Sequence, residues 1–196
     1  KKHMHQINNQ QKFTLGVLIL AGILCRTLNF EIGDFHIVPI GALALFGGYA
    51  LRNRYLSILV PVLTMFISDL YLEVTQPGFG FYGISQVFVY LGMAAFAVLG
   101  SGMRSGKPLP VLGYTLTGSL VFWIVSNLGV YLGGYYGYSF NGFMTTYLMA
   151  LPFRQNDAYS NLLFFNIILV NVAVAQVIFA AYHYALSRNS RAVKAA

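Results

Sequence analysis

The stretch FHIVPIGALALFGGYALRNR, from Phe35 to Arg54, decides how the rest of the chain folds. It has a histidine and a proline near one end, small and apolar residues in the middle, and two arginines at the other end. Proline suits the first turn of a helix, because the N–H that it lacks has no intrahelical partner there. We therefore predict a short or tilted membrane helix over Ile37–Leu51, with the arginines as aqueous anchors.

The composition extends this interpretation to the whole chain. Of its 196 residues, 57% are hydrophobic and only 9% are charged, whereas soluble domains carry about 25% charged residues. Apolar runs recur from Phe13 to Tyr184, with the charges in the gaps between them. This pattern predicts one all-α integral membrane domain over residues 13–187, between an N-terminal tail at 1–12 and a basic tail at 188–196.

Six segments are apolar enough to be membrane spans, since a hydrocarbon core of roughly 30 Å takes about 20 helical residues. The predicted spans are Phe13–Leu28, Ile37–Leu51, Leu56–Leu72, Phe81–Met103, Leu109–Leu132 and Tyr159–Leu186. The aromatic and glycine-rich stretch Gly133–Asp157 is too irregular for a span. We predict a short helix there, near Phe140–Leu151, at the membrane interface.

With six spans, the charges separate by sign. Ten of the twelve Lys and Arg residues fall on one side: Lys1, Lys2, Lys12, Arg52, Arg54, Arg104, Lys107, Arg188, Arg191 and Lys194. All five acids fall on the other side: Glu31, Asp34, Asp69, Glu73 and Asp157. Cations gather in cytoplasmic loops, so both termini are predicted to be cytoplasmic. The same separation argues against nucleic acid as the reason for the net charge of +7.

Two cations remain on the outer side, Arg26 and Arg154, and Asp69 lies within the third predicted span. A charge inside a membrane is costly and normally faces a partner or a cavity. Asp69 therefore forms either a structural pair with one of these arginines or part of an outward-facing ligand pocket. The two alternatives are compatible, because one pair can line a pocket.

Further polar and aromatic residues lie in the same outer layer, and together they predict a pocket there. They are His36, Tyr82, Gln86, Trp123 and Asn127. Singly, each would more often be a helix cap, an interfacial anchor or an interhelical hydrogen bond. The cytoplasmic half has few polar residues in its spans, which favours a binding protein over an open pore.

Signatures of catalysis and of cofactor binding are absent from the sequence. The stretch SGMRSGKPLP has Ser101 and Pro108 where a phosphate-binding loop needs Gly and Ser or Thr. There is no HExxH motif, and the lone Cys25 excludes a disulfide framework and a thiolate metal cluster. We expect no enzyme activity, no metal and no cofactor.

Five short motifs follow one another along the chain. They are RTL at Arg26–Leu28, PIGALALFGGY at Pro39–Tyr49, FISDLYL at Phe66–Leu72, SNLGVYL at Ser126–Leu132 and ALPFRQN at Ala150–Asn156. In this order they resemble a family of small bacterial membrane proteins related to the substrate-binding S components of energy-coupling factor (ECF) transporters. Within that relation the chain also looks like the solitary cobalamin importers of Gram-negative bacteria. The resemblance covers about residues 26–166.

The resemblance implies a six-helix S-component fold in the bacterial inner membrane. It implies capture of a vitamin or related micronutrient from the outer side, and release when the whole protein topples in the bilayer. Many S components work with a membrane T component and two ATPase subunits, whereas the solitary importers resemble them without a dedicated module. By resemblance, Asp69, Arg154 and Asn127 are the first candidates for substrate binding, followed by Arg26, Tyr82, Gln86, Trp123 and His36.

Cobalamin is a candidate substrate, with one departure from the importers that the chain resembles. They use a cysteine after the Ser-Asp motif as a cobalt ligand, but the corresponding stretch here, EVTQPGFGFYGISQ, has none. Two other functions stay open. An ion-coupled secondary carrier of a small solute would show inverted repeats and broken helices, and a non-transporting scaffold subunit would have a constant partner.

The apolar middle of the opening stretch carries small residues on one helical face, at Gly41, Ala44 and Gly48. Small residues let membrane helices approach closely, because lipid gives no hydrophobic drive for their association. Packing against a neighbouring span is the favoured interpretation. The alternative is a smooth surface that docks on a transport partner.

Overall fold

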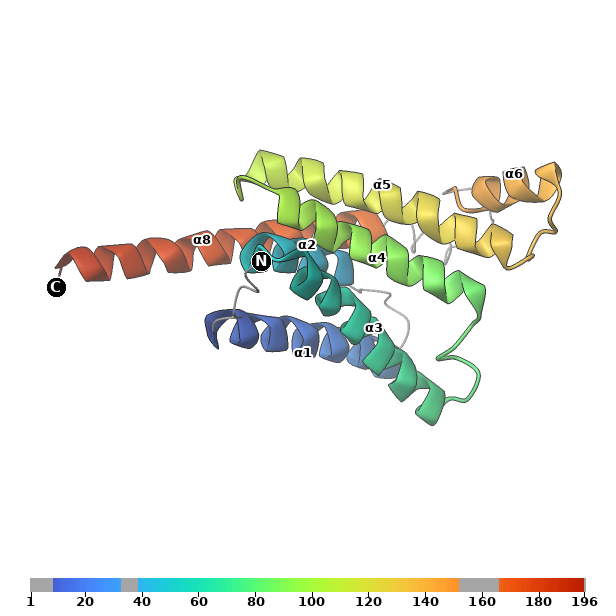
Figure 1. Cartoon of the computed structure of the whole chain (residues 1–196), viewed down its shortest axis with the longest axis horizontal. Coiled ribbons are helices and arrows are strands. Elements are labelled where there is room, and N and C mark those ends of the chain that lie inside the picture. The colour runs from blue at the N-terminus through green and yellow to red at the C-terminus, as the bar shows by residue number, and fades with distance from the viewer. Residues whose placement is uncertain (1–8, 33–38, 152–165, 196) are drawn as a thin grey trace, which may run out of the picture.

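The computed structural model describes residues 9–32, 39–151 and 166–195, and these residues form helices and connections without a strand. The helices are α1 (Asn9–Ile32), α2 (Ile40–Leu51), α3 (Arg54–Thr75), α4 (Ile84–Gly102), α5 (Pro108–Leu132), α6 (Phe140–Met149) and α8 (Asn171–Ala195), with a π-helical turn η1 (Asn166–Val170) before α8. In Figure 1, α1, α3 and α5 start at the left of the bundle, and α2, α4 and α8 return toward that side.

Five of the described helices are long and apolar enough to cross a membrane: α1, α3, α4, α5 and α8. The described residues are thus all-α, as predicted, and the length and composition of these helices indicate a membrane protein. The short helix α6 lies where the sequence predicted one, and α5 matches its predicted span within one residue. The helix α8 runs on to Ala195, so the segment predicted as a basic tail continues a helix.

The second predicted span is α2, and it is short. Its 12 residues begin directly after Pro39, which gives a length of roughly 18 Å at 1.5 Å per residue. Every residue of α2 except Ala50 is buried, and the helix contacts α1, α3, α4, α5 and α8. It is therefore the centre of the core, and lipid-facing helices surround it.

The charged groups of the described residues lie at opposite ends of the bundle. One end, called the basic end below, is formed by the helix termini that carry Lys12, Arg52, Arg54, Arg104 and Lys107. The other, called the acidic end, carries Glu31, Asp69 and Glu73, together with Arg26 as the one described cation that the sequence also places there. The structure therefore preserves the separation by sign that the sequence indicates.

The face formed by Gly41, Ala44 and Gly48 lies inside the bundle, which favours internal packing over docking of a partner. A Cβ atom on Gly48 would lie 2.6 Å from the backbone nitrogen of Ser101 on α4. A Cβ atom on Gly100 would lie 2.8 Å from the carbonyl carbon of Leu45 on α2. Glycine on both helices thus lets the two backbones touch where α2 and α4 cross.

The start of α2 is capped by a residue far away in the sequence. Pro39 precedes the helix and makes no side-chain cap, so the amides of the first turn need other partners. The buried side chain of Asn171 on α8 supplies one, because its Oδ1 accepts from the backbone N–H of Ala42 at 2.8 Å. This bond fixes α8 against the central helix, in the interhelical role expected for a polar residue in a membrane bundle.

Asn171→Ala is expected to lower the free energy of unfolding by about 1 to 3 kcal/mol, because it leaves the buried Ala42 N–H without this acceptor. The measurement is thermal unfolding of the purified protein in detergent. Gln176→Ala on the same helix is the control, since Gln176 bonds the Pro108 carbonyl at an exposed position. Equal losses of stability from the two variants would contradict the capping role of Asn171.

Candidate functional site

The site begins where α1 crosses α3. A Cβ atom on Gly22 would lie 2.5 Å from Cγ2 of Thr64, so glycine allows a close crossing. One helical turn further along each helix, Arg26 meets Ser68 and Asp69, since residues four apart share a helix face. Both helices continue beyond their predicted ends, and Asp69 therefore lies six residues before Thr75, roughly 9 Å from the end of α3.

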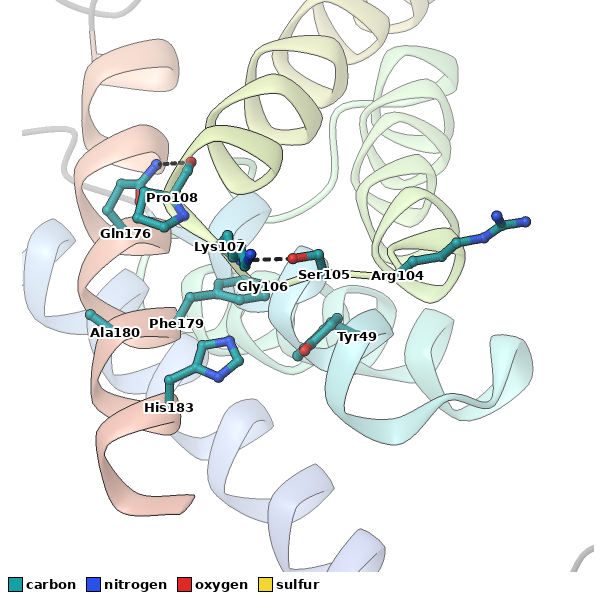
Figure 2. Close-up of a pocket in the computed structure, with 10 residues that line it drawn as sticks. All are labelled: Tyr49, Arg104, Ser105, Gly106, Lys107, Pro108, Gln176, Phe179, Ala180 and His183. Atoms are coloured by element: carbon teal, nitrogen blue, oxygen red, sulfur yellow. Dashed lines mark hydrogen bonds between the residues drawn. The ribbon is translucent and has the colours of Figure 1, made fainter. Parts of the chain in front are cut away.

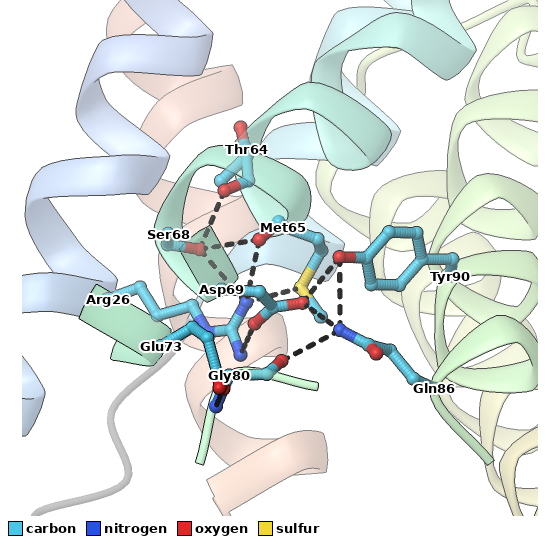
Figure 3. Close-up of polar contacts among 9 residues, drawn as sticks. All are labelled: Arg26, Thr64, Met65, Ser68, Asp69, Glu73, Gly80, Gln86 and Tyr90. Carbon is cyan, nitrogen blue, oxygen red and sulfur yellow. Dashed lines mark hydrogen bonds and ion pairs between the residues drawn. The ribbon is translucent and has the colours of Figure 1, made fainter. Parts of the chain in front are cut away.

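Asp69 is fully buried and forms an ion pair with Arg26, whose Nη2 contacts Oδ1 of the carboxylate (Figure 3). The other guanidinium nitrogen, Nη1, donates to Oγ of Ser68 at 2.9 Å and to the carbonyl oxygen of Met65 at 3.2 Å. Among the described residues, the guanidinium is thus held by α3, at three neighbouring positions. This geometry fixes the charged head of Arg26 and attaches α1 to the bundle.

The second carboxylate oxygen of Asp69 accepts from α4. Gln86 Nε2 donates to Oδ2 at 2.7 Å, and the hydroxyl of Tyr90 donates to the same oxygen (Figure 3). Gln86 and Tyr90 lie four residues apart, on one face of α4, and Gln86 Nε2 also lies 3.3 Å from the Tyr90 hydroxyl. Three helices therefore converge on one carboxylate.

The loop between α3 and α4, residues 76–83, covers the ion pair. Both oxygens of Glu73 accept backbone N–H bonds from this loop, from Gly78 at 3.1 Å and from Gly80 at 3.0 Å. Gln86 Nε2 donates to the carbonyl of Gly80 at 2.9 Å. A Cβ atom on Gly80 would lie 2.6 Å from Cβ of Glu73. The loop is therefore pinned to both helices, and glycine is needed where it approaches α3.

Tyr82 lies in this loop and is within electrostatic reach of the ion pair. Its side chain is 46% exposed. Partial burial raises its pKa above the ordinary value, the charge of Asp69 raises that pKa further, and Arg26 opposes the rise. The hydroxyl therefore stays protonated at neutral pH and can donate a hydrogen bond. Phe79 and Phe81 on the same loop are also exposed, so the loop presents aromatic side chains at the acidic end.

Trp123 and Asn127 lie in another part of the structure. The amide of Asn127 donates to the carbonyl of Trp123 on its own helix at 2.8 Å. The indole N–H of Trp123 donates to the carbonyl of Ala150 at 3.1 Å, and its ring packs edge-on against Tyr147. Among the described helices, α3 and α5 make no contact. Trp123 therefore holds α6 against α5, Asn127 bonds within α5, and neither residue is brought to the Arg26–Asp69 pair.

Trp123 is the single tryptophan of the chain, so its fluorescence reports on the docking of α6. Tyr147→Ala removes both the ring contact and the bond from the Tyr147 hydroxyl to the Ile124 carbonyl at 2.9 Å. We expect a red-shifted emission maximum, because the indole becomes more hydrated. Tyr135→Ala, which changes an exposed tyrosine of the α5–α6 connection, is the control. An unchanged spectrum in Tyr147→Ala would contradict the docking of α6 on Trp123.

Of the eight predicted binding residues, the structure brings together Arg26, Asp69 and Gln86, with Tyr82 close by. Arg154 and His36 lie outside the described residues. Tyr90, Ser68 and Glu73 belong to the site and were missed by sequence reasoning. The spacing of four between Gln86 and Tyr90, and between Asp69 and Glu73, is the signal that could have found two of them.

Within the described part of the chain, no group of three or more His, Cys, Asp or Glu side chains could hold a metal ion. The site is instead an ion pair with amide and phenol donors. Such a set can recognise polar groups of a solute, since guanidinium, amide and phenol groups all offer N–H or O–H donors.

A family model described as "Family of unknown function (DUF6580)" matches residues 6–188, which include all of the site residues. No curated protein and no solved structure matches the chain.

Proposed function

The chain belongs to this family of unknown function, and we propose that it is a membrane uptake protein that captures a small solute at the acidic end of its bundle. The observation that carries the proposal is the buried Arg26–Asp69 pair with its Gln86 and Tyr90 donors. A buried ion pair is often no more stabilising than hydrophobic residues of the same volume. Stability alone therefore does not explain why these ionisable residues lie within membrane segments, and a functional role is the better explanation.

The distribution of polar groups supports capture and rearrangement over an open pore. Near the basic end, the buried hydroxyls of Ser57 and Thr115 each bond a carbonyl four residues earlier in the chain, those of Asn53 and Val111. Among the described residues, a cluster of charged and polar side chains thus lies at the acidic end, and no comparable cluster continues it through the middle of the bundle. A solute bound at the acidic end would be released after the protein tilts or rearranges, as the resemblance to S components implies.

We further propose six crossings, with α2 as the short central one. The alternating helix directions and the separation of charges support this count. The basic end then faces the cytoplasm and the acidic end faces outward, in the inner membrane of a bacterium. The resemblance adds a vitamin-type solute, with cobalamin as one candidate, and a T component with two ATPases as partners that such a protein can use.

Access to the ion pair requires movement of the α3–α4 loop. Asp69 is fully buried beneath Gly80, and Glu73 and Gln86 hold the loop in place. When the loop lifts, Gln86 loses its bond to Gly80 and becomes free to bond a solute. The exposed aromatic side chains of the same loop would then contact the apolar parts of that solute.

The charge of the acidic end indicates which charge the bound solute can carry. Among the described residues, the carboxylates of Glu31, Asp69 and Glu73 outnumber the single guanidinium of Arg26. A negative mouth concentrates cations and repels anions. The proposal therefore favours neutral or cationic solutes over anionic ones.

The test is mass spectrometry of small molecules that remain bound through purification, followed by thermal-shift titration with a panel of neutral, cationic and anionic micronutrients. We expect one neutral or cationic compound to bind with one molecule per chain and to raise the unfolding temperature. If no compound is carried through and none of the panel shifts the unfolding temperature, the proposal fails.

An ion-coupled secondary carrier is the second candidate, and the full burial of Asp69 next to the Tyr90 hydroxyl favours it. Buried carboxylates in membrane helices serve as proton relays in pumps and transporters. The two functions differ in energy source. Uptake into proteoliposomes that follows an imposed proton or sodium gradient, without ATP, would select the carrier.

A further inference from the structure

A pocket opens at the basic end of the bundle, far along the helices from the Arg26–Asp69 pair. It has a volume of about 520 Å³ and lies between the end of α2, the α4–α5 connection and α8 (Figure 2). The residues that line it are Tyr49, Arg104, Ser105, Gly106, Lys107, Pro108, Gln176, Phe179, Ala180 and His183.

Glycine and aromatic residues shape the walls of this pocket. A Cβ atom on Gly106 would collide with the imidazole of His183 and lie 3.0 Å from Cδ1 of Phe179, so the connection presses directly on α8. The ring of Tyr49 packs on Phe179 with a centroid distance of 5.1 Å. Gln176 Nε2 donates to the carbonyl of Pro108 at 2.9 Å and fixes α8 to the start of α5.

The lining is positively charged and contains no acidic residue. Arg104 and Lys107 contribute the charges, and the Arg104 side chain points away from the other lining residues in Figure 2. Arg52 does not line the pocket and stacks on the Tyr49 ring, with Cζ at 5.3 Å from the ring centroid. Lys107 is therefore the cation most closely associated with the pocket, and His183 and Gln176 add nitrogen groups.

The backbone at the start of α5 gives little help to an anion. Pro108 and Pro110 have no N–H, and the N–H of Lys107 already bonds Oγ of Ser105 at 3.3 Å. The amide cluster that usually binds anions at a helix N-terminus is thus largely missing. Recognition has to come from the side chains, above all from the ammonium group of Lys107.

One wall of the pocket belongs to a membrane helix and continues into an apolar surface. Gln176, Phe179, Ala180 and His183 all lie within the apolar window of α8, at 168–187. Val177 and Ala180 are exposed on this helix, three residues apart and on one face. A molecule seated in the pocket can therefore lay an apolar part along α8. A phospholipid has such a part, whereas a water-soluble phosphate compound does not.

We propose that this pocket binds the phosphate headgroup of an anionic phospholipid, with the acyl chains lying along α8. Headgroups occupy the level at which the basic end meets water, and basic pockets between membrane helices on the cytoplasmic side suit anionic headgroups. Lysine binds phosphate as a point charge. The lipid would also offset the excess of positive charge at this end of the bundle.

The test adds lipids to the full chain purified in a neutral detergent. The probes are phosphatidylglycerol, phosphatidylcholine with the same acyl chains, and inorganic phosphate. We expect phosphatidylglycerol alone to raise the unfolding temperature and to remain bound in native mass spectrometry. An equal response to phosphatidylcholine, or to inorganic phosphate, would overturn the proposal, because the site would then not select an anionic lipid.

Three variants locate the binding. Lys107→Gln is expected to weaken phosphatidylglycerol binding about fivefold, and Ala180→Phe is expected to weaken it by filling the pocket without a change of charge. Arg54→Gln removes one exposed cation at the same end but outside the lining, so it should leave the affinity unchanged. Equal losses from Lys107→Gln and Arg54→Gln would show a general surface attraction and overturn the pocket as the site.

Discussion

Gly48→Leu is expected to lower the free energy of unfolding by about 3 kcal/mol, the upper part of the usual range for overpacking a core. The backbone of α4 leaves no room for a side chain, because a Cβ atom would lie 2.6 Å from the Ser101 nitrogen and 2.8 Å from the Gly100 carbonyl carbon. Backbone atoms cannot rotate away as a flexible side chain can. The measurement is the unfolding temperature of the purified protein in detergent.

Gly113→Leu is the matched control for this prediction. Gly113 also lies inside a helix, α5, but beyond the adjacent residues and the backbone of its own helix no described atom lies within 4 Å of the place where its Cβ would be. Both variants replace glycine by leucine within a helix, so a difference between them reports the local packing and not the effect of leucine itself. Similar unfolding temperatures for the two variants would show that α2 does not pack backbone to backbone on α4.

The positions of the helices could be predicted from the sequence because membrane insertion is decided by local composition. Apolar runs of sufficient length mark α3, α4 and α5 closely, and Pro39 marks the start of α2. The glycines of α2 indicated close packing. Their actual partners, the backbone atoms of α4, follow only from the way in which the helices cross.

The grouping of polar residues could be predicted only in part. A charge inside a membrane needs a partner, so Asp69 was expected to pair with Arg26 or Arg154 or to line a pocket, and the structure pairs it with Arg26. Asn127 looked equally suited to a ligand site, but its amide bonds the carbonyl of Trp123 one turn earlier. Asn171 caps a helix 129 residues away. Nothing local in the sequence distinguishes these three situations, because each depends on which helices lie next to each other.

Asp69→Asn and Arg26→Gln are each expected to lower the free energy of unfolding by about 3 to 5 kcal/mol, because each leaves a desolvated charge without its partner. In Asp69→Asn the guanidinium remains fixed to Ser68 and Met65 without a counter-charge. In Arg26→Gln the fully buried carboxylate remains among Gln86 and Tyr90. Thermal unfolding in detergent measures both losses, and Arg54→Gln at the exposed basic end is the control.

The double variant Arg26→Met with Asp69→Leu separates a structural role of the pair from a role in solute capture. Replacing both charges by apolar residues of similar size is often neutral for stability, and Gln86 keeps its bond to Gly80. We therefore expect most of the stability to return. If the pair captures solute, the double variant folds but retains no small molecule through purification and takes up none. A double variant that is stable and still binds solute would show that the pair only holds α1 to α3. The capture site would then lie elsewhere on the acidic end.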